Sequence, residues 1–144
     1  EVRWSESDEL INAHINPLLT QPARGVIIWG ARTLSREPQW VHINARRIVS
    51  LVSEQLRRDS EWVVFENQRP ELWEIVARSV RSRLDQIWSA GLLTGDQAGL
   101  DYDVQCDAET NPLKVRDAGE IHVRVMLRPI STAEFIIVEL QLGR

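Results

Sequence analysis

The stretch that decides the fold is Gly25-Val-Ile-Ile-Trp-Gly-Ala-Arg-Thr-Leu34, followed after a short polar turn by Trp40-Val-His-Ile-Asn-Ala-Arg-Arg47. Four apolar residues, 26–29, lie between two glycines. This pattern predicts a short strand that is buried on both faces and has backbone freedom at each end. The predicted strand carries no acid, base or nucleophile. It therefore indicates a mechanical part and not a catalyst.

Three arginines lie close to this apolar run: Arg32, Arg46 and Arg47. An arginine beside apolar side chains is tolerated only where its planar guanidinium group finds carboxylates or carbonyl oxygens as partners. Fixed polar contacts at a boundary between subunits would supply those partners. We therefore predict a polar interface at these three residues.

The composition of the 144 residues is that of an ordinary soluble domain, with 43% hydrophobic and 26% charged residues. No apolar run is long enough to span a bilayer, so we expect no direct membrane insertion. A net charge of -4 argues against a nucleic-acid partner, because a local basic face would have to override it. Sixteen of the 17 basic residues are arginine, the cation suited to bidentate contacts at interfaces. A GC-rich genome would explain this bias equally well.

Cysteine and methionine are each present once. The single cysteine, Cys106, excludes an intramolecular disulfide and a cysteine-based metal cage, which fits assembly in a reducing cytoplasm. The sequence shows no signal-peptide pattern. Because the only methionine is Met126, we expect residues 1–144 to be one domain of a longer protein.

Apolar residues at three- and four-residue spacing predict three helices: one within 5–19 that ends near Asn16-Pro17, one from His42 to near Asp59, and one from Pro70 to Ala90. The third is the clearest, since it has a proline in its first turn and Gly91 as a C-terminal cap. The short apolar run 62–65 predicts a second buried strand or an extended link.

Three strands are predicted in the C-terminal third: Tyr102–Cys106, Glu120–Arg128 and Glu134–Leu142. The middle strand alternates apolar and polar residues, which is typical of a half-buried sheet. The predicted fold class is α+β, with two to three helices packed on a small mixed, mostly antiparallel sheet.

The last predicted strand differs from the others, because residues 135–138 are apolar on both faces although the strand lies at a chain end. An unpaired apolar strand is an aggregation hazard unless something covers it. A central position in the domain's own sheet and strand addition between neighbouring subunits explain the pattern equally well. The candidate inter-subunit strand consists of Phe135, Ile136, Ile137, Val138, Glu139 and Leu140.

The helix predicted over 70–90 carries a charged face opposite its apolar stripe, formed by Glu74, Arg78, Arg81 and Asp85. Glu74 and Arg78 are four residues apart, in the favourable order for a surface ion pair. Such a face is most often solvated. The alternative is that this charged face contacts a partner protein.

The acidic residues Asp101, Asp103, Asp107 and Glu109 are the best candidates for a divalent-cation site. They lack the turn glycine and the bidentate glutamate of a calcium loop, and strand alternation predicts that Asp101 and Asp103 lie on an outer face. We therefore expect no metal and no cofactor. The three histidines are scattered, so we expect no catalytic residues and no enzyme. The alternative function is a small metal- or ligand-binding enzyme domain that uses Asp101, Asp103 and Asp107.

Six segments resemble, in family order, the C-terminal domain of contractile tail sheath proteins: residues 25–34, 40–47, 63–67, 72–73, 90–95 and 133–137. The resemblance runs from about Ile11 to Leu142, and Gly-Ala-Arg-Thr at 30–33 is its most specific piece. Contractile phage tails, R-type pyocins, extracellular injection machines and type VI secretion systems all use such sheaths. The resemblance does not choose among them.

The resemblance implies a structural subunit that polymerises helically around an inner tube in a high-energy extended state. Contraction of the sheath then drives the tube through a target envelope without consuming nucleotide. The implied partners are other sheath subunits, the inner tube protein and the baseplate, and the charged face of helix 70–90 is a candidate tube contact. The implied location is cytoplasmic assembly into a virion tail or a phage-tail-like particle. In this family the tube-proximal core domain also takes a strand from the N-terminus.

Overall fold

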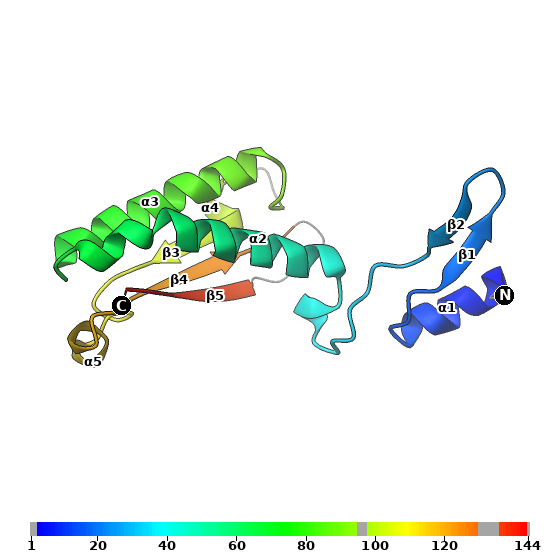
Figure 1. The fold of residues 1–144 in the computed structure, drawn as a ribbon, viewed down its shortest axis with the longest axis horizontal. Coiled ribbons are helices and arrows are strands. Elements are labelled where there is room, and N and C mark those ends of the chain that lie inside the picture. The colour runs from blue at the N-terminus through cyan, green and yellow to red at the C-terminus, as the bar shows by residue number, and fades with distance from the viewer. Residues whose placement is uncertain (1–2, 95–97, 130–135, 144) are drawn as a thin grey trace. The chain divides into compact units, whose positions relative to one another are not determined.

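A computed structural model describes residues 3–94, 98–129 and 136–143 (Figure 1). The chain divides into two compact units, residues 1–46 and 47–144. Within the described ranges, no helix is long and apolar enough to cross a membrane.

The first unit contains helix α1 (Trp4–Asn12) and an antiparallel hairpin of β1 (Leu18–Gln21) and β2 (Gly25–Ile28). The expected helix within 5–19 is therefore too long. It ends because His14 adopts a left-handed backbone, at φ 62°, and the amide of Ile15 donates to the carbonyl of Leu10. These two features close a helix C-terminus and turn the chain towards β1.

The predicted strand at 26–29 exists as β2, but the prediction that both its faces are buried is wrong. Val26 and Ile28 are 68% and 70% exposed, and only Ile27 between them is half-buried. A two-stranded ribbon has two faces, and the described residues cover only the one that carries Ile27 and the buried Leu19.

The two longest helices are α2 (Ile43–Asp59) and α3 (Pro70–Ser89), and both agree closely with the sequence prediction. Helix α3 begins with Pro70 at a position where its missing amide hydrogen costs nothing. Gly91, at φ 75°, ends it as predicted. Between the two helices, the residues predicted as a strand or link form a short 3-10 helix, η2 (Glu61–Phe65), in which only Val63 is buried.

A three-stranded antiparallel sheet follows, in the order β3 (Tyr102–Gln105), β4 (Ile121–Leu127), β5 (Ile136–Leu142). All strand pairs in the described residues are antiparallel, so the α+β prediction is confirmed and the sheets are simpler than the mixed sheet expected. Three short elements complete the fold: η1 (Pro38–Trp40), α4 (Ala98–Asp101) and α5 (Leu113–Asp117).

Helices α2 and α3 lie on one face of this sheet (Figure 1). Burial alternates strictly along β4 and β5, so every second side chain joins the core beneath the helices. Val80, Leu84 and Val125 are at most 1% exposed. Each such side chain contributes about 1.5–3 kcal/mol through burial. The core therefore lies on the side of the sheet that faces α2 and α3, and the alternate side chains of β4 and β5 point to the opposite side.

Candidate assembly surfaces

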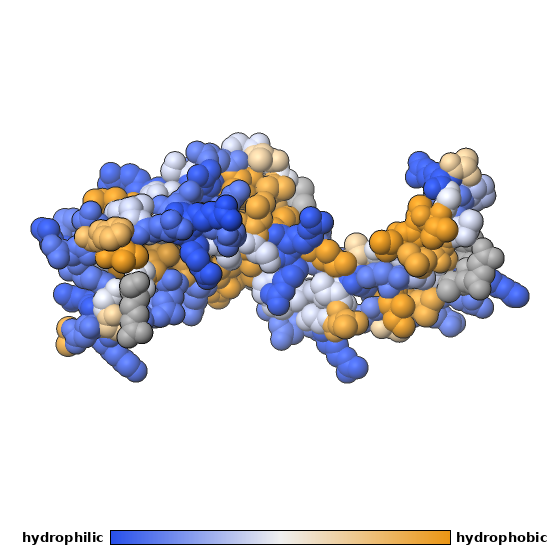
Figure 2. Space-filling model, in the orientation of Figure 1, coloured by the Kyte–Doolittle hydropathy of each residue, from blue (hydrophilic) through white to orange (hydrophobic). Residues whose placement is uncertain are grey.

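The outer face of the β1–β2 hairpin is apolar and open to solvent. Leu18 lies opposite Ile28 and Thr20 lies opposite Val26, so these four side chains share one face. Leu18 is 61% exposed, which is comparable with Val26 and Ile28. Figure 2 shows the apolar residues gathered over the hairpin. Among the described residues, neither outer edge of the ribbon is paired with another strand. Such a surface is suited to receive another chain.

Asn16 anchors the segment that follows the hairpin. Its side-chain Nδ2 donates to the carbonyl of Arg32 at 2.8 Å, and the amide of Arg32 donates to Asn16 Oδ1 at 3.0 Å. The side chain thus replaces one residue of a neighbouring strand. A Cβ atom at Gly30 would lie 2.6 Å from Asn16 Oδ1. The glycine of the Gly-Ala-Arg-Thr motif is therefore required by the approach of Asn16.

The same segment is joined to the loop before α2. The amide of Thr33 donates to the carbonyl of Val41 at 2.7 Å, and the amide of Ile43 donates to the carbonyl of Ala31 at 3.0 Å. His14 Nδ1 lies 2.9 Å from the carbonyl oxygen of Thr33. Two of the segments that carry the family resemblance, 25–34 and 40–47, are thus joined to each other and to residues 14–16 by hydrogen bonds.

The three arginines predicted as a polar interface have different surroundings. Arg46 stacks on Trp40, with its Cζ atom 4.3 Å from the ring centroid. Arg32 is half-buried and Arg47 is exposed. Within the part of the chain that the structure describes, none of the three forms an ion pair with a carboxylate. Their predicted role as interface residues stays a prediction.

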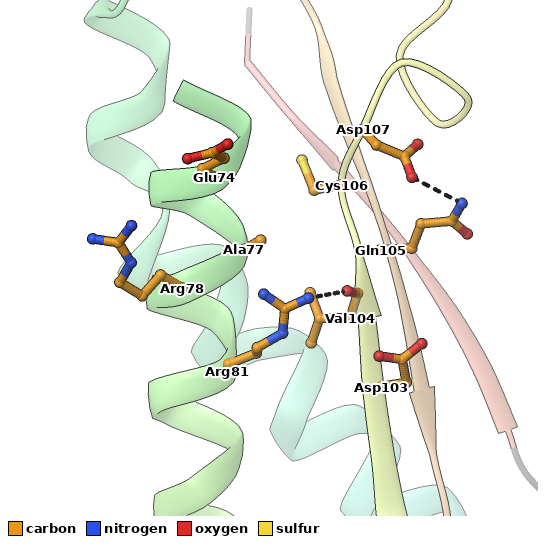
Figure 3. A pocket seen from close by; sticks show the side chains of 9 residues that line it. All are labelled: Glu74, Ala77, Arg78, Arg81, Asp103, Val104, Gln105, Cys106 and Asp107. Carbon is orange, nitrogen blue, oxygen red and sulfur yellow. Dashed lines mark hydrogen bonds between the residues drawn. The ribbon is translucent and has the colours of Figure 1, made fainter. Parts of the chain in front are cut away.

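A hollow of about 630 Å³ lies between the charged face of α3 and the outer edge of β3 (Figure 3). Arg81 crosses it, and its Nη2 donates to the carbonyl of Val104 at 2.7 Å. Asp85 accepts a hydrogen bond from the hydroxyl of Tyr102. Burial and this contact with Asp85 raise the pKa of Tyr102 to about 12, so the phenol stays protonated at neutral pH.

The four predicted contact residues on α3 are all exposed but differ in their contacts. Arg81 and Asp85 form hydrogen bonds to β3, whereas Glu74 and Arg78 form none to it within the described residues. Cys106 also lines the hollow. Burial raises the pKa of the Cys106 thiol to about 11, which makes it a poor nucleophile.

Strand β5 contains five of the six residues predicted for an inter-subunit strand, and Phe135 lies outside the described residues. Ile136, Val138 and Leu140 are buried beneath the helices, while Ile137 is 58% exposed on the opposite face. One edge of β5 is paired with β4 along its whole length. No other described strand pairs with the second edge. Strand β5 thus belongs to the domain's own sheet, at its edge and not at its centre.

The four acidic residues predicted as the best candidates for a cation site have different surroundings. Asp101 is 1% exposed and accepts a hydrogen bond from Trp88 Nε1 at 3.0 Å, so its predicted outer position is wrong; the end of α4, not a strand, sets its direction. Asp103 is exposed, as predicted. Hydrogen bonds, first from the amide of Thr110, lower the pKa of Asp107. No group of three or more potential metal ligands occurs in the described ranges.

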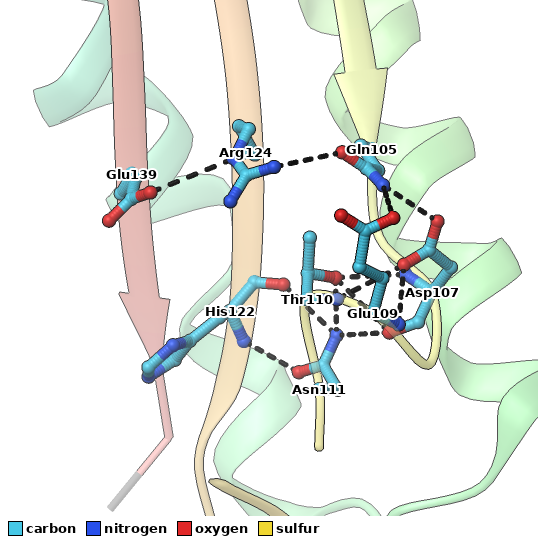
Figure 4. A network of polar contacts seen from close by, with 8 residues as sticks. All are labelled: Gln105, Asp107, Glu109, Thr110, Asn111, His122, Arg124 and Glu139. Carbon is cyan, nitrogen blue, oxygen red and sulfur yellow. Dashed lines mark hydrogen bonds and ion pairs between the residues drawn. The ribbon is translucent and has the colours of Figure 1, made fainter.

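A polar network on the open face of the sheet centres on Asn111 (Figure 4). Asn111 is 1% exposed, accepts from the amide of His122 at 2.7 Å and donates to the carbonyl of His122 at 3.0 Å. It also donates to the carbonyl of Asp107 at 3.0 Å. Sequence reasoning missed both asparagine anchors. Their shared signal is a following proline, which favours an extended backbone at the residue before it.

Comparisons with known proteins agree on one family. The model of the phage tail sheath C-terminal domain matches residues 35–143. The tail sheath protein of Vibrio phage KVP40 is 26% identical over 140 residues, which are 94% of this chain and 20% of that protein. A chain in the cryo-EM structure of the anti-feeding prophage baseplate matches with a TM-score of 0.84 at 26% identity, over 97% of this chain and 39% of that chain.

A second solved structure is similar. It is the sheath complex of an extracellular contractile injection system, PVC, in the contracted state, with a TM-score of 0.80 and 29% identity. The match covers 96% of this chain and 40% of that one. The chain thus spans about a fifth of the curated relative and about two fifths of the solved chains.

Proposed function

Because this chain belongs to the phage tail sheath C-terminal domain family, we propose that it acts as the tube-proximal domain of a contractile sheath subunit. In this role it polymerises with other copies around an inner tube, attaches to a baseplate, and contracts to drive the tube through a target envelope. Assembly takes place in the cytoplasm, before the particle is complete. The acidic-site alternative has no support, since Asp101 is buried and bonded to Trp88 whereas Asp103 is exposed.

The observation that carries this proposal is the exposed hairpin. Three large apolar side chains on its outer face are each more than 60% exposed, and both ribbon edges lack a partner strand in the described residues. A two-stranded ribbon in water is marginally stable by itself. Coverage by neighbouring subunits would remove this apolar area from water and pair the strand edges.

The second edge of β5 offers another place for strand addition. Removal of β5 from its own sheet would break its pairing at seven positions, from Ile121–Leu142 to Leu127–Ile136. We therefore place the inter-subunit linkage at the outer edge of residues 136–140, with β5 still bound to β4. Main-chain hydrogen bonds at such an edge would survive rigid-body rotation of subunits, whereas side-chain contacts would break and reform.

The remaining contacts are assigned to charged side chains without a partner. Glu74 and Arg78 are exposed on α3 and form no hydrogen bond to β3 in the described residues, so they are available to the inner tube. Arg32 and Arg47 have no carboxylate partner within the described residues, and a neighbouring subunit would supply one. Arg46, already stacked on Trp40, would position that contact.

Negative-stain electron microscopy of the full-length protein, with and without its inner tube protein, tests the proposal. Hollow helical cylinders are expected from the wild type. Val26→Lys/Ile28→Lys should abolish them, because two charges would be placed on the covered face. The matched control is Phe65→Lys/Leu113→Lys, which adds the same charge at apolar residues 89% and 66% exposed. Small uniform particles from the wild type under every condition would contradict the proposed function.

A further inference from the structure

The outer edge of β3 carries backbone groups that point away from the rest of the sheet. The amide of Arg128 donates to the carbonyl of Asp101 at 2.9 Å, directly before β3. In an antiparallel pair, every second residue bonds to the neighbouring strand. Counted from Asp101, the backbone groups of Val104 therefore point away from β4 and lie at the outer edge of the sheet.

Arg81 occupies this edge. Its Nη2 donates to the carbonyl of Val104 at 2.7 Å, from α3 across to β3 (Figure 3). A strand added here would need the same carbonyl as an acceptor for one of its own amides. It would also cover the guanidinium group of an exposed side chain that forms no ion pair within the described ranges. Because removal of an unpaired charge from water is costly, Arg81 opposes strand addition in two ways.

Helix α3 alone does not close the edge. The hollow of about 630 Å³ between α3 and β3 leaves space beside the strand, and Arg78 and Cys106 also line it. Arg78 forms no hydrogen bond to β3 in the described residues. Charged side chains placed over a sheet edge are a general means of preventing unwanted strand pairing. At the edge of β3, this means depends on the single side chain of Arg81.

The outer edge of β5 has no comparable contact in the part of the chain that the structure describes. The alternation from Arg128 along β4 directs the backbone groups of Val125 towards β5, where Val138 lies opposite. The backbone groups of Ile137 and Glu139 therefore point to the outer edge. No hydrogen bond to them occurs within the described residues. Strand β5 also runs for seven residues, against four in β3, so it offers the longer and less obstructed edge.

We propose that Arg81 closes the outer edge of β3 to other chains and thereby directs strand addition to β5. Arg81 is then a positioning residue for assembly, because it determines which edge of the sheet a second copy can extend. Two equivalent edges would allow two different subunit contacts, whereas a helical assembly repeats one contact. The direction to β5 rests on the proposed function, but the closure of β3 does not.

The test uses full-length protein that carries Val26→Lys/Ile28→Lys, so that sheath assembly does not obscure the result, and contains no inner tube protein. In this parent, Arg81→Leu should form sedimentable material at a protein concentration at least about tenfold lower, because one hydrogen bond and one charge no longer protect the edge. Hydrogen exchange of peptide 102–106 should slow in that material, because the outward amide of Val104 gains a partner.

Two further variants separate the bond from the charge and the apolar surface. Arg78→Leu is the matched control, since it removes the same charge and adds the same side chain in the same hollow but breaks no bond to β3. The inner tube is absent, so the contact assigned to Arg78 is not involved, and this variant should remain as small as the parent. Arg81→Lys keeps a charged donor over the edge and should also remain small.

The other outcomes refute defined statements. Equal association of Arg81→Leu and Arg78→Leu, or association of neither, would refute closure by the bond to Val104. Aggregates of Arg81→Leu without slower exchange at 102–106 would reduce Arg81 to a structural role and refute it too. In wild-type polymer, exchange should slow at 137–141 and not at 102–106; the reverse pattern would refute the inference and leave the proposed function intact. Absence of wild-type polymer would refute the proposed function and the direction to β5, while the variants in the parent protein would still decide the closure of β3.

Discussion

Replacement of Asn111 by alanine should destabilise the sheet more than any surface substitution. The change removes the acceptor for the amide of His122 and the donor to its carbonyl, at 2.7 and 3.0 Å. It also removes the donor to the carbonyl of Asp107. Alanine cannot satisfy these backbone groups, and the side chain that it replaces is 1% exposed.

The expected loss in unfolding free energy follows from the number of backbone groups that lose their hydrogen-bond partner. Each buried backbone group that loses its hydrogen bond costs about 1–3 kcal/mol. The two groups of His122 lie on a half-buried strand residue, which water reaches in part. The lower half of that range applies, so the expected loss in unfolding free energy is roughly 2–4 kcal/mol. For a chain of this size, this lowers Tm by about 8–16 °C.

Urea denaturation followed by circular dichroism measures this loss. Asn67→Ala is the matched control, because Asn67 is exposed and its side chain forms no hydrogen bond within the described residues. Asn111→Asp keeps an acceptor and loses the donor. Its buried carboxyl will have a raised pKa, so this variant should become more stable as the pH falls through that value. An Asn111→Ala variant within about 0.5 kcal/mol of the wild type would refute the role of Asn111 as the hydrogen-bond partner of the His122 backbone.

Three further predictions follow from single contacts. Gly30→Ala should lower the unfolding free energy by about 1–3 kcal/mol, because φ is 134° there and the new Cβ would lie 2.6 Å from Asn16 Oδ1; an unchanged melting curve would contradict this. The pKa of Tyr102 is raised in the fold from 10.0 to about 12, so its contribution is complete below pH 10 and is lost as the pH rises towards 12; Tyr102→Phe should remove that pH dependence from urea titrations, and an equal slope in both proteins would count against it. Cys106, with its pKa raised to about 11, should react with iodoacetamide at pH 8 more slowly than a free thiol; equal rates would show that the thiol is not shielded.

Helix α3 and strand β4 could be predicted from the sequence because their signals are local. The apolar period, Pro70 and Gly91 mark the helix and its ends, and strict alternation marks the strand. The predicted end of the first helix, near Asn16-Pro17, was wrong for the opposite reason. Helix α1 ends at Asn12 because His14 adopts a left-handed backbone, and the apolar spacing of this stretch does not reveal that.

The candidate surfaces were predictable only in part. The amphipathic order of β5 and the charged face of α3 are visible in the sequence, yet the bond from Arg81 to Val104 is not. The burial of Asp101 was also missed, because Asp101 ends the four-residue helix α4 and does not continue the alternation of the strand that follows. Exposure of the hairpin face depends on what other chain covers it, and no local pattern contains that information.

By itself, the sequence determined the kind and order of the main helices and strands of this protein. Its short sequence motifs also indicated the family to which it belongs. The helices and strands are recognisable because a helix or strand with one buried face repeats its apolar residues at a fixed period, and caps mark its ends. Only the tertiary structure decided that Asn16 stands beside Arg32 and Asn111 beside His122. It also decided that one face of the hairpin is not covered by any of the described residues. These facts depend on which distant segments the folded chain brings together. The spacing of apolar residues along the sequence does not reveal those long-range contacts.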